Sequence, residues 1–203
     1  MAEAAAIPVT DITAEDALRA QLYDLLSVLL RKPPSREFIT MVAVLNGDDS
    51  DLGRGIDALA HRARMTTPED IDREFNRLFV GLGRGELLPF ASYYLTGFLN
   101  EKPLAKLRGD MAALGMVRDA GACEPEDNIG SLCEMMAGMI YGRFGEPVPL
   151  ARQKDFFFTH IAPWAEHFFG DLEKAKTAEF YAPLGSVGAA FMRIEAQAFR
   201  MTE

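Results

Sequence analysis

The sequence predicts an all-α protein built from many helices. Leucines near the start of the chain recur at spacings of three and four, which places one apolar stripe along a helix. These leucines are Leu18, Leu22, Leu25, Leu26, Leu29 and Leu30. The same period returns along the chain, whereas strand-like alternation bounded by turn residues is hard to find. With 203 residues and 49% hydrophobic content, the chain can bury a core without disulfides.

Capping residues and prolines set the expected helix limits. The side chain of Thr13 can accept the amide of Asp16 and start the first helix, and Pro33 ends it because proline lacks an amide hydrogen. Thr67 followed by Pro68 starts another helix, which runs to the glycine-rich stretch at 81–85. The remaining expected helices span about 35–46, 52–64, 100–114, 124–144, 150–160, 163–176 and 178–201.

These limits predict two helical lobes that pack as one unit. We expect a flexible N-terminus at 1–12, an N-terminal lobe at 13–115, a hinge at 116–123 and a C-terminal lobe at 124–203. The hinge contains glycine and two opposite charges and lacks helical periodicity. Such a hinge would permit lobe exchange between protomers, so a monomer and a domain-swapped dimer both remain open.

The charge balance narrows the classes of partner. Acidic residues outnumber basic ones by 30 to 21, for a formal net charge of −9. This charge repels nucleic acid and anionic lipid and favours a basic peptide, although it could serve solubility alone. No signal-peptide pattern or membrane-spanning apolar stretch is present, and only two cysteines occur. We therefore expect a cytoplasmic protein with no nucleic-acid partner and no direct membrane insertion.

Candidates for catalysis or cofactor binding are weak. The loop Gly81–Gly85 suggests a phosphate cradle, but it has no P-loop Lys-Ser/Thr pair and follows no strand. His160 and His167 have no further ligand at zinc spacing, so we expect no metal. Cys133 lies among apolar helix positions, and Cys123 beside an acid is a poor nucleophile. The sequence therefore predicts a binding protein with no cofactor, and not an enzyme.

Two segments stand out as binding candidates. Residues 124–128 read Glu-Pro-Glu-Asp-Asn, an acidic group at an expected helix start. Such acids can simply answer the helix dipole, or they can bind guanidinium groups. Residues 87–95 are apolar and aromatic, which fits either core packing or an exposed groove for an apolar peptide. The candidate residues are Leu87, Phe90, Ser92, Tyr93, Tyr94, Glu124, Glu126, Asp127 and Asn128.

With these segments the sequence resembles the TorD/DmsD family of redox-enzyme maturation chaperones. Residues 124–128 resemble the family's E-P-x-D-H motif, and 74–81 and 89–95 resemble its L-F-x-G and P-x-x-S-x-Y-L patterns. Residues 153–164 resemble its Q-x-x-F…H-L-x-P-W helix pair. The motifs occur in the family's order over about 18–200 of the chain.

The resemblance implies a function as well as a two-lobed, all-α fold. It implies a cytoplasmic chaperone that binds the twin-arginine signal peptide, or the apo form, of a molybdenum-cofactor oxidoreductase and delays export until the cofactor is inserted. A formate dehydrogenase or a sulfoxide or amine-oxide reductase would fit as client. Under this hypothesis Asp127, with Glu124 or Glu126, binds the arginines, and Phe90, Tyr93 or Tyr94 with Leu87 covers the apolar part.

One departure and two alternatives remain. The histidine of the family motif is Asn128 here, which keeps hydrogen bonding but cannot titrate near neutral pH. A helical adaptor or regulator that binds a folded client, and a nucleotide-binding protein that uses Gly81–Gly85, are the alternative functions. DNA-binding regulation ranks lowest, because the sequence shows no basic recognition helix.

Overall fold

Capping side chains begin the first four helices of the computed structural model, which describes residues 12–118 and 124–201. In each case a Ser or Thr hydroxyl accepts a backbone amide from the first turn of the helix. These helices and their caps are α1 (Ala14–Arg31) after Thr13, α2 (Arg36–Ala43) after Ser35, α3 (Asp51–Met65) after Ser50 and α4 (Pro68–Phe75) after Thr67. The predicted starts of these four helices are thus confirmed to within about one residue.

Later helices depart from the expected limits in three ways. The fourth helix and the one expected at 150–160 each end in a π-helical turn, η1 (Asn76–Val80) and η2 (Phe157–Ile161). A short unexpected helix, α5 (Ala91–Thr96), lies within the aromatic segment. The helix expected at 124–144 spans only Ile129–Tyr141, because residues 124–128 lie outside it. The remaining helices are α6 (Lys102–Ala113), α7 (Ile129–Tyr141), α8 (Leu150–Phe156), α9 (Ala165–Lys174) and α10 (Tyr181–Met201).

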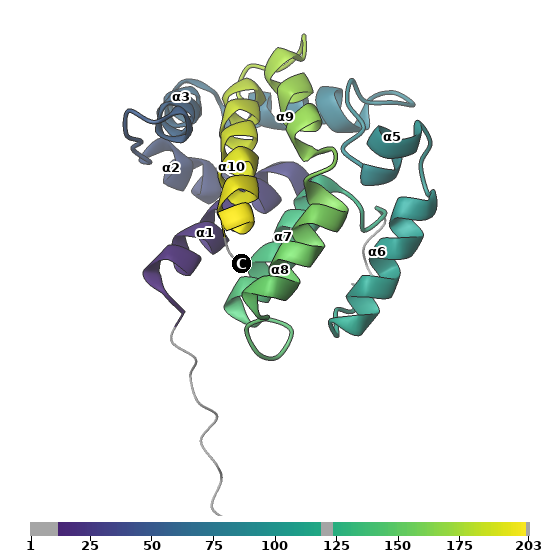
Figure 1. Ribbon diagram of the computed structural model, residues 1–203. Helices are drawn as coiled ribbons and strands as arrows, with labels where there is room; N and C mark the ends of the chain where they lie inside the picture. Colours follow the sequence, from purple (N-terminus) through teal and green to yellow (C-terminus); the bar gives the residue numbers. More distant parts are fainter. Residues whose placement is uncertain (1–11, 119–123, 202–203) are drawn as a thin grey trace, which may run out of the picture.

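The helices enclose one hydrophobic core. Helix α1 packs along α7, and α10 packs against α9 and α3. In Figure 1, α2 and α3 lie at one side and α5 and α6 at the other, with α1, α7, α8, α9 and α10 between them. Throughout the described residues the chain forms helices and loops and one isolated β-bridge, which confirms the all-α prediction. None of the described helices is both long and apolar enough to span a membrane.

The packing crosses the expected lobe boundary. Helices α1 and α3 of the range 13–115 pack on α7 and α10 of the range 124–203. The core cluster contains side chains from both ranges, among them Tyr23, Leu59, Trp164 and Tyr181. Most of the expected hinge at 116–123 lies outside the described residues. The division into lobes, and their exchange between protomers, therefore stay predictions.

A carboxylate from α4 caps the start of α10. Glu74 is buried, and its oxygens accept the amides of Glu179, Phe180 and Tyr181 at 2.8, 3.0 and 2.8 Å. Backbone amides at a helix start have no acceptor within the helix, so a buried start needs one from elsewhere. Glu74 supplies that acceptor and ties the last helix to the N-terminal half of the chain.

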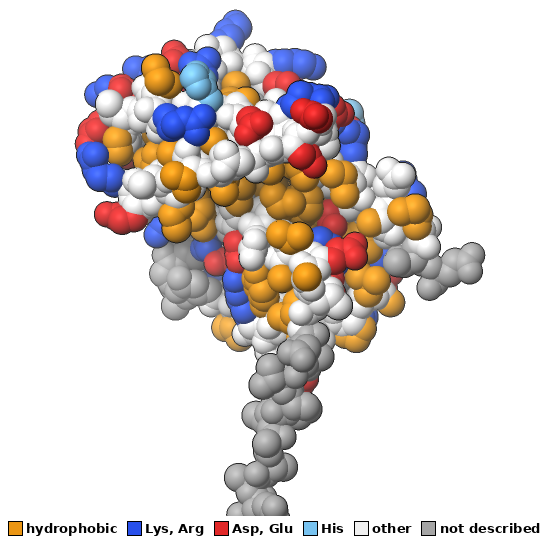
Figure 2. Space-filling model, turned by 90° about the vertical axis from the view of Figure 1, so that its left-hand side faces the viewer, with side chains coloured by type: hydrophobic (Ala, Val, Ile, Leu, Met, Phe, Trp, Pro, Cys, Tyr) orange, Lys and Arg blue, Asp and Glu red, His pale blue; other side chains and the backbone are white. Residues whose placement is uncertain are grey.

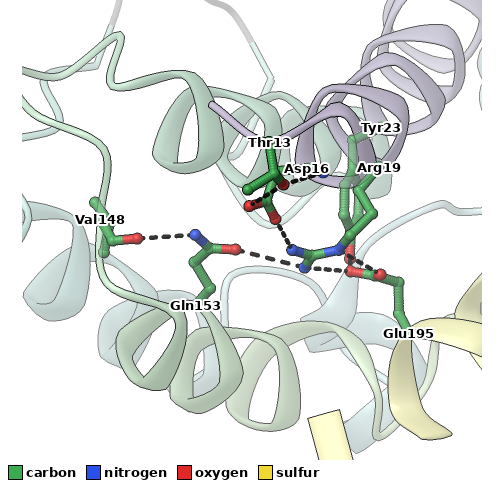
Figure 3. A network of polar contacts seen from close by, with 7 residues as sticks. All are labelled: Thr13, Asp16, Arg19, Tyr23, Val148, Gln153 and Glu195. Atoms are coloured by element: carbon green, nitrogen blue, oxygen red, sulfur yellow. Dashed lines mark hydrogen bonds and ion pairs between the residues drawn. The ribbon is translucent and has the colours of Figure 1, made fainter. Parts of the chain in front are cut away.

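A buried ion pair ties α1 to α10. Arg19 donates from Nε and Nη2 to the two carboxylate oxygens of Glu195 at 2.8 and 2.9 Å, and the Tyr23 hydroxyl donates to the same carboxylate at 2.9 Å (Figure 3). Arg19 also contacts Asp16 at 2.7 Å and Gln153 of α8 at 3.4 Å. Glu195 is only 1% exposed, so every partner of its charge is protein. The network fixes α1 against both α8 and α10.

We predict that Glu195→Ala lowers the free energy of unfolding by about 3 kcal/mol, because it removes the buried partner of the largely buried Arg19 cation and leaves only its pair with Asp16. Urea denaturation followed by circular dichroism measures the change. Arg193→Ala is the matched control on the same helix, because its pair with Glu166 is exposed and contributes about 1 kcal/mol or less. Equal losses in the two variants would contradict the prediction.

Candidate functional site

The two candidate binding segments lie against each other. The amide of Ile129 donates to the carbonyl oxygen of Pro89 at 2.9 Å, and the amide of Ala91 donates to that of Asp127 at 3.0 Å. These bonds form an antiparallel bridge between Phe90 and Asn128. The structure thus brings residues 87–94 and 124–128 to one place, just before α5 and α7 begin.

Asp127 lies beneath the surface of this junction. It is 1% exposed, and its Oδ2 accepts the amide of Ser92 in the first turn of α5 at 2.7 Å. No hydrogen-bond partner for its Oδ1, or for the fully buried hydroxyl of Ser92, is found among the described residues. In this conformation Asp127 caps α5 and offers almost no surface to an external arginine.

Glu126 already binds guanidinium groups of the same chain. Arg108 of α6 donates from Nε to both carboxylate oxygens at 3.1 and 3.2 Å and from Nη2 at 2.9 Å. Arg118 lies 3.6 Å from the same carboxylate. Burial, the largest single effect, raises the pKa of Glu126, but the hydrogen bonds from Arg108, a backbone hydrogen bond and the charges of Arg108 and Arg118 together lower that pKa below its ordinary value. The carboxylate therefore stays ionised and bound to arginine.

Glu124 and Asn128 differ from each other in role. The N-cap of α7 is Asn128 and not one of the acids at 124–127. The Oδ1 atom of Asn128 accepts the amide of Gly130 at 2.8 Å. The expected helix start near Glu124 is therefore wrong. Asn128 also donates from Nδ2 to Glu124 at 3.2 Å. Glu124 keeps contact with solvent, yet enough protein surrounds its carboxylate that desolvation raises its pKa.

The aromatic segment is mostly part of the core. Phe90 is buried, and Leu87 is half-buried against the core. Tyr94 packs its ring on Trp164, with 5.3 Å between centroids, and donates its hydroxyl to Asp171 at 3.0 Å. The sequence left two alternatives open for this segment, core packing and an exposed groove. The structure shows core packing for Leu87, Phe90 and Tyr94.

Tyr93 is partly exposed and contacts Arg84. Its hydroxyl accepts Nη2 of Arg84 at 2.6 Å, and the guanidinium of Arg84 lies 5.2 Å from the centroid of its ring. Arg84 is exposed and belongs to the glycine-rich loop at 81–85. The exposed side of Tyr93 is therefore covered by a cation, while Leu95 at the end of the segment is 43% exposed.

A surface cavity of about 320 Å³ borders the acidic segment. It is lined by Glu124 and Glu126 and by residues that the sequence did not single out, among them Arg31, Met116, Arg118, Glu134 and Arg143. Arg31 and Glu134 form an ion pair at 2.5 Å across its wall. Glu134 is the only charged residue of the apolar helix α7. This is the one feature of the sequence that could have identified Glu134 as a candidate.

The other candidate sites have structural explanations. Cys133 is fully buried, and burial raises the pKa of its thiol, whereas Cys123 lies outside the described residues. His160 lies 2.7 Å from Asp110 of α6 and packs on Phe156. Within the described part of the chain, no group of three metal-ligating side chains is found.

The loop Gly81–Gly85 turns the chain back on itself. Gly81 follows η1 with a φ of 63°, a conformation that favours glycine. The amides of Glu86 and Leu87 then donate to the carbonyl oxygens of Arg77 and Leu78. The glycines are thus explained by this turn.

We predict that Asn128→Ala lowers the free energy of unfolding by roughly 0.5–2 kcal/mol, because α7 loses its N-cap. Chemical denaturation measures the loss. Asn128→Ser keeps an acceptor for the Gly130 amide and should retain most of the stability. A serine variant as unstable as the alanine variant would show that the capping bond is unimportant.

Comparisons with known proteins agree on one family. The family model described as nitrate reductase delta subunit matches residues 45–170. The chain is 27% identical to chaperone protein TorD of Vibrio atlanticus over 92% of this chain and 97% of that protein. It is 25% identical to chaperone protein TorD of Vibrio cholerae over 86% and 89%.

A solved structure supports the same fold. A crystal structure of an Archaeoglobus fulgidus protein, named for redox enzyme maturation, superposes with a TM-score of 0.57 over 87% of this chain and 94% of that one. Its sequence identity is 19%, so the likeness concerns the fold alone. The family match covers more than half of the chain. The chain therefore belongs to the nitrate reductase delta subunit family of TorD-type redox-enzyme maturation chaperones.

Proposed function

We propose that this protein is a cytoplasmic chaperone that binds the twin-arginine leader of an apo-molybdoenzyme and delays its export until the cofactor is inserted. Its membership of a family whose curated relatives are named chaperones supports this function. A formate dehydrogenase and a sulfoxide or amine-oxide reductase both remain candidate clients. In this proposal the protein acts by binding and catalyses no reaction.

The observation that carries the proposal is the ion pair between Glu126 and Arg108. Nε and Nη2 of Arg108 lie 2.9–3.2 Å from its two oxygens, the fork geometry in which guanidinium and carboxylate fit best. A leader with two adjacent arginines presents the same groups from outside. One leader arginine would replace Arg108 on Glu126, and the other would bind Glu124, which is open to solvent.

Such a replacement has a low energetic cost. The Arg108 side chain is 51% exposed, so water screens its pair with Glu126 and Arg108 can return to solvent easily. The net charge of −9 attracts a basic leader before contact. Asp127, Ser92 and Phe90 would support the site from below, because Asp127 holds the start of α5 in place through the Ser92 amide.

We predict that Glu126→Gln weakens leader binding by up to about fivefold, because the leader arginine only replaces Arg108 in a water-screened pair that contributes about 1 kcal/mol or less. Calorimetry with a synthetic peptide of two adjacent arginines followed by a leucine–alanine stretch measures the affinity. Glu69→Gln, which alters an exposed pair with Arg36, should bind like the wild type. A peptide that binds both variants equally would remove Glu126 from the site.

Removal of the internal competitor should have the opposite effect. We predict that Arg108→Ala raises the affinity for the same peptide by roughly two- to fivefold, the range expected when a half-exposed ion pair no longer competes. Arg73→Ala, which breaks an exposed pair with Asp70 on α4, is the control. Weaker binding by Arg108→Ala would mean that Arg108 supports the site instead of occupying it.

A client without its leader separates this proposal from the adaptor alternative. The apo-client and a leaderless form of it are compared for capture by the wild-type chaperone. We expect capture to drop when the leader is removed. Equal capture of both forms would favour an adaptor that recognises a folded domain.

A further inference from the structure

Three surface cavities lie next to one another and share lining residues. The cavity at the acidic segment shares Arg31, Glu124, Ser131, Glu134 and Arg143 with a second cavity of about 680 Å³. The second shares Asp24 and Phe38 with a third cavity of about 740 Å³. We call these three neighbouring cavities together the trough. It runs from Glu124 and Glu126 along α1 to the space between α1, α2 and α3.

The far end of the trough is apolar and open. Its wall residues include Leu18, Leu22 and Leu25 of α1, Met41 of α2 and Ile56 of α3. Leu18 is 63% exposed and Met41 57% exposed. Figure 2 shows the face on which α2 and α3 lie, where hydrophobic side chains gather across a hollow with charged side chains around it. An exposed apolar patch of this kind marks an interaction surface.

The charges around the trough select a basic occupant. Asp24 and Asp48 line the apolar end, and among the described residues no lysine or arginine lines it. In the middle of the trough, Arg143 is paired with Asp24 at 2.5 Å, and Arg31 is paired with Glu134. Lys32 lines the middle as well, so cations and acids are about balanced there, and Glu124 and Glu126 lie at the other end. An occupant with arginine at that end followed by an apolar stretch matches this order.

We propose that the apolar end of the trough binds the apolar stretch that follows the arginine pair of the client's leader. This inference rests on the proposed function. It assigns the apolar part of the leader to α1, α2 and α3 and not to the aromatic segment 87–95. Phe90 is 8% exposed, whereas Leu18 and Met41 are 63% and 57% exposed, so these two side chains offer a peptide apolar area that Phe90 does not.

Two other occupants fit the charges less well. Residues 1–11 of this chain contain Glu3 and Asp11 and no lysine or arginine, so they do not complement an end lined by Asp24 and Asp48. A second copy of the chain carries the same net charge of −9. A leader with an arginine pair has the complementary charge.

Fluorescence anisotropy with the labelled arginine–leucine–alanine peptide tests the proposal on the full chain. We expect Leu18→Glu and Met41→Glu to weaken binding about tenfold or more, since each places a charge against the apolar stretch. Both side chains are exposed, so the fold should survive, and circular dichroism checks this. Met65→Glu is the matched control: Met65 is 72% exposed at the end of α3 and does not line the trough.

A second peptide identifies which part of the leader is bound there. It keeps the two arginines and replaces the leucine–alanine stretch by serine and glycine. The wild type should bind it more weakly than the first peptide, and Leu18→Glu should not weaken it further. If the wild type binds neither peptide, the proposed function itself fails. If the wild type binds the first peptide and both trough variants bind that peptide as tightly as the wild type does, only the present inference is overturned.

Two further outcomes would assign the surface to another occupant and overturn the inference. If a second copy covers the trough, light scattering would show that the wild type is a dimer and that the Met41→Glu variant is a monomer. Ile7→Glu combined with Val9→Glu would raise the affinity for the first peptide, if residues 1–11 occupy the trough. We expect neither change.

Discussion

The buried pair between Arg19 and Glu195 fixes the register of α1 against α10. Glu195 is 1% exposed, so α10 and α1 can bury that charge only while they stay in register. Helix α1 in turn supplies Leu18, Asp24 and Arg31 to the wall of the trough. The open face of α1 is therefore positioned by a charge pair on its opposite side. The same constraint passes through α7, because α7 packs along α1 and begins at the acidic segment.

Local signals predicted the fold well, and distant contacts explain the errors. Thr13, Ser35 and Thr67 cap helices within their own first turns, so sequence neighbours suffice to find those starts. The start of α7 was missed because bonds to the distant segment 89–91 hold residues 124–128 outside the helix. The sequence positions of Glu74 and Glu195 could have indicated that both acids are buried. Each lies three residues after a buried apolar residue, on the inward face of its helix. An acid at such a position indicates a buried partner but does not identify it.

The sequence singled out the segments 87–94 and 124–128, and the structure places them against each other. That they bind a leader stays a prediction, and the sequence did not predict how buried they are. Whether a carboxylate faces solvent depends on α6, whose Arg108 lies far from Glu126 in sequence but pairs with it in the fold. The net charge of −9 does not reveal this pairing either, because a total charge does not show that Glu126 already pairs with arginines of the same chain. The apolar end of the trough was missed for a related reason: periodicity alone cannot separate a leucine that faces the core from Leu18, which faces water.

In the proposed binding mode, arginine and apolar contacts contribute differently. A leader arginine that replaces Arg108 exchanges one guanidinium for another on Glu126, so this contact adds little net free energy. It still imposes register, because only a guanidinium reproduces the two-point contact and a lysine cannot. Affinity must then come from the apolar stretch, whose burial is non-directional and tolerates different side chains. A chaperone that must later release its client benefits from this division. Arg108 remains beside the site as a replacement partner for Glu126, so the leader can depart without leaving a buried carboxylate unpaired.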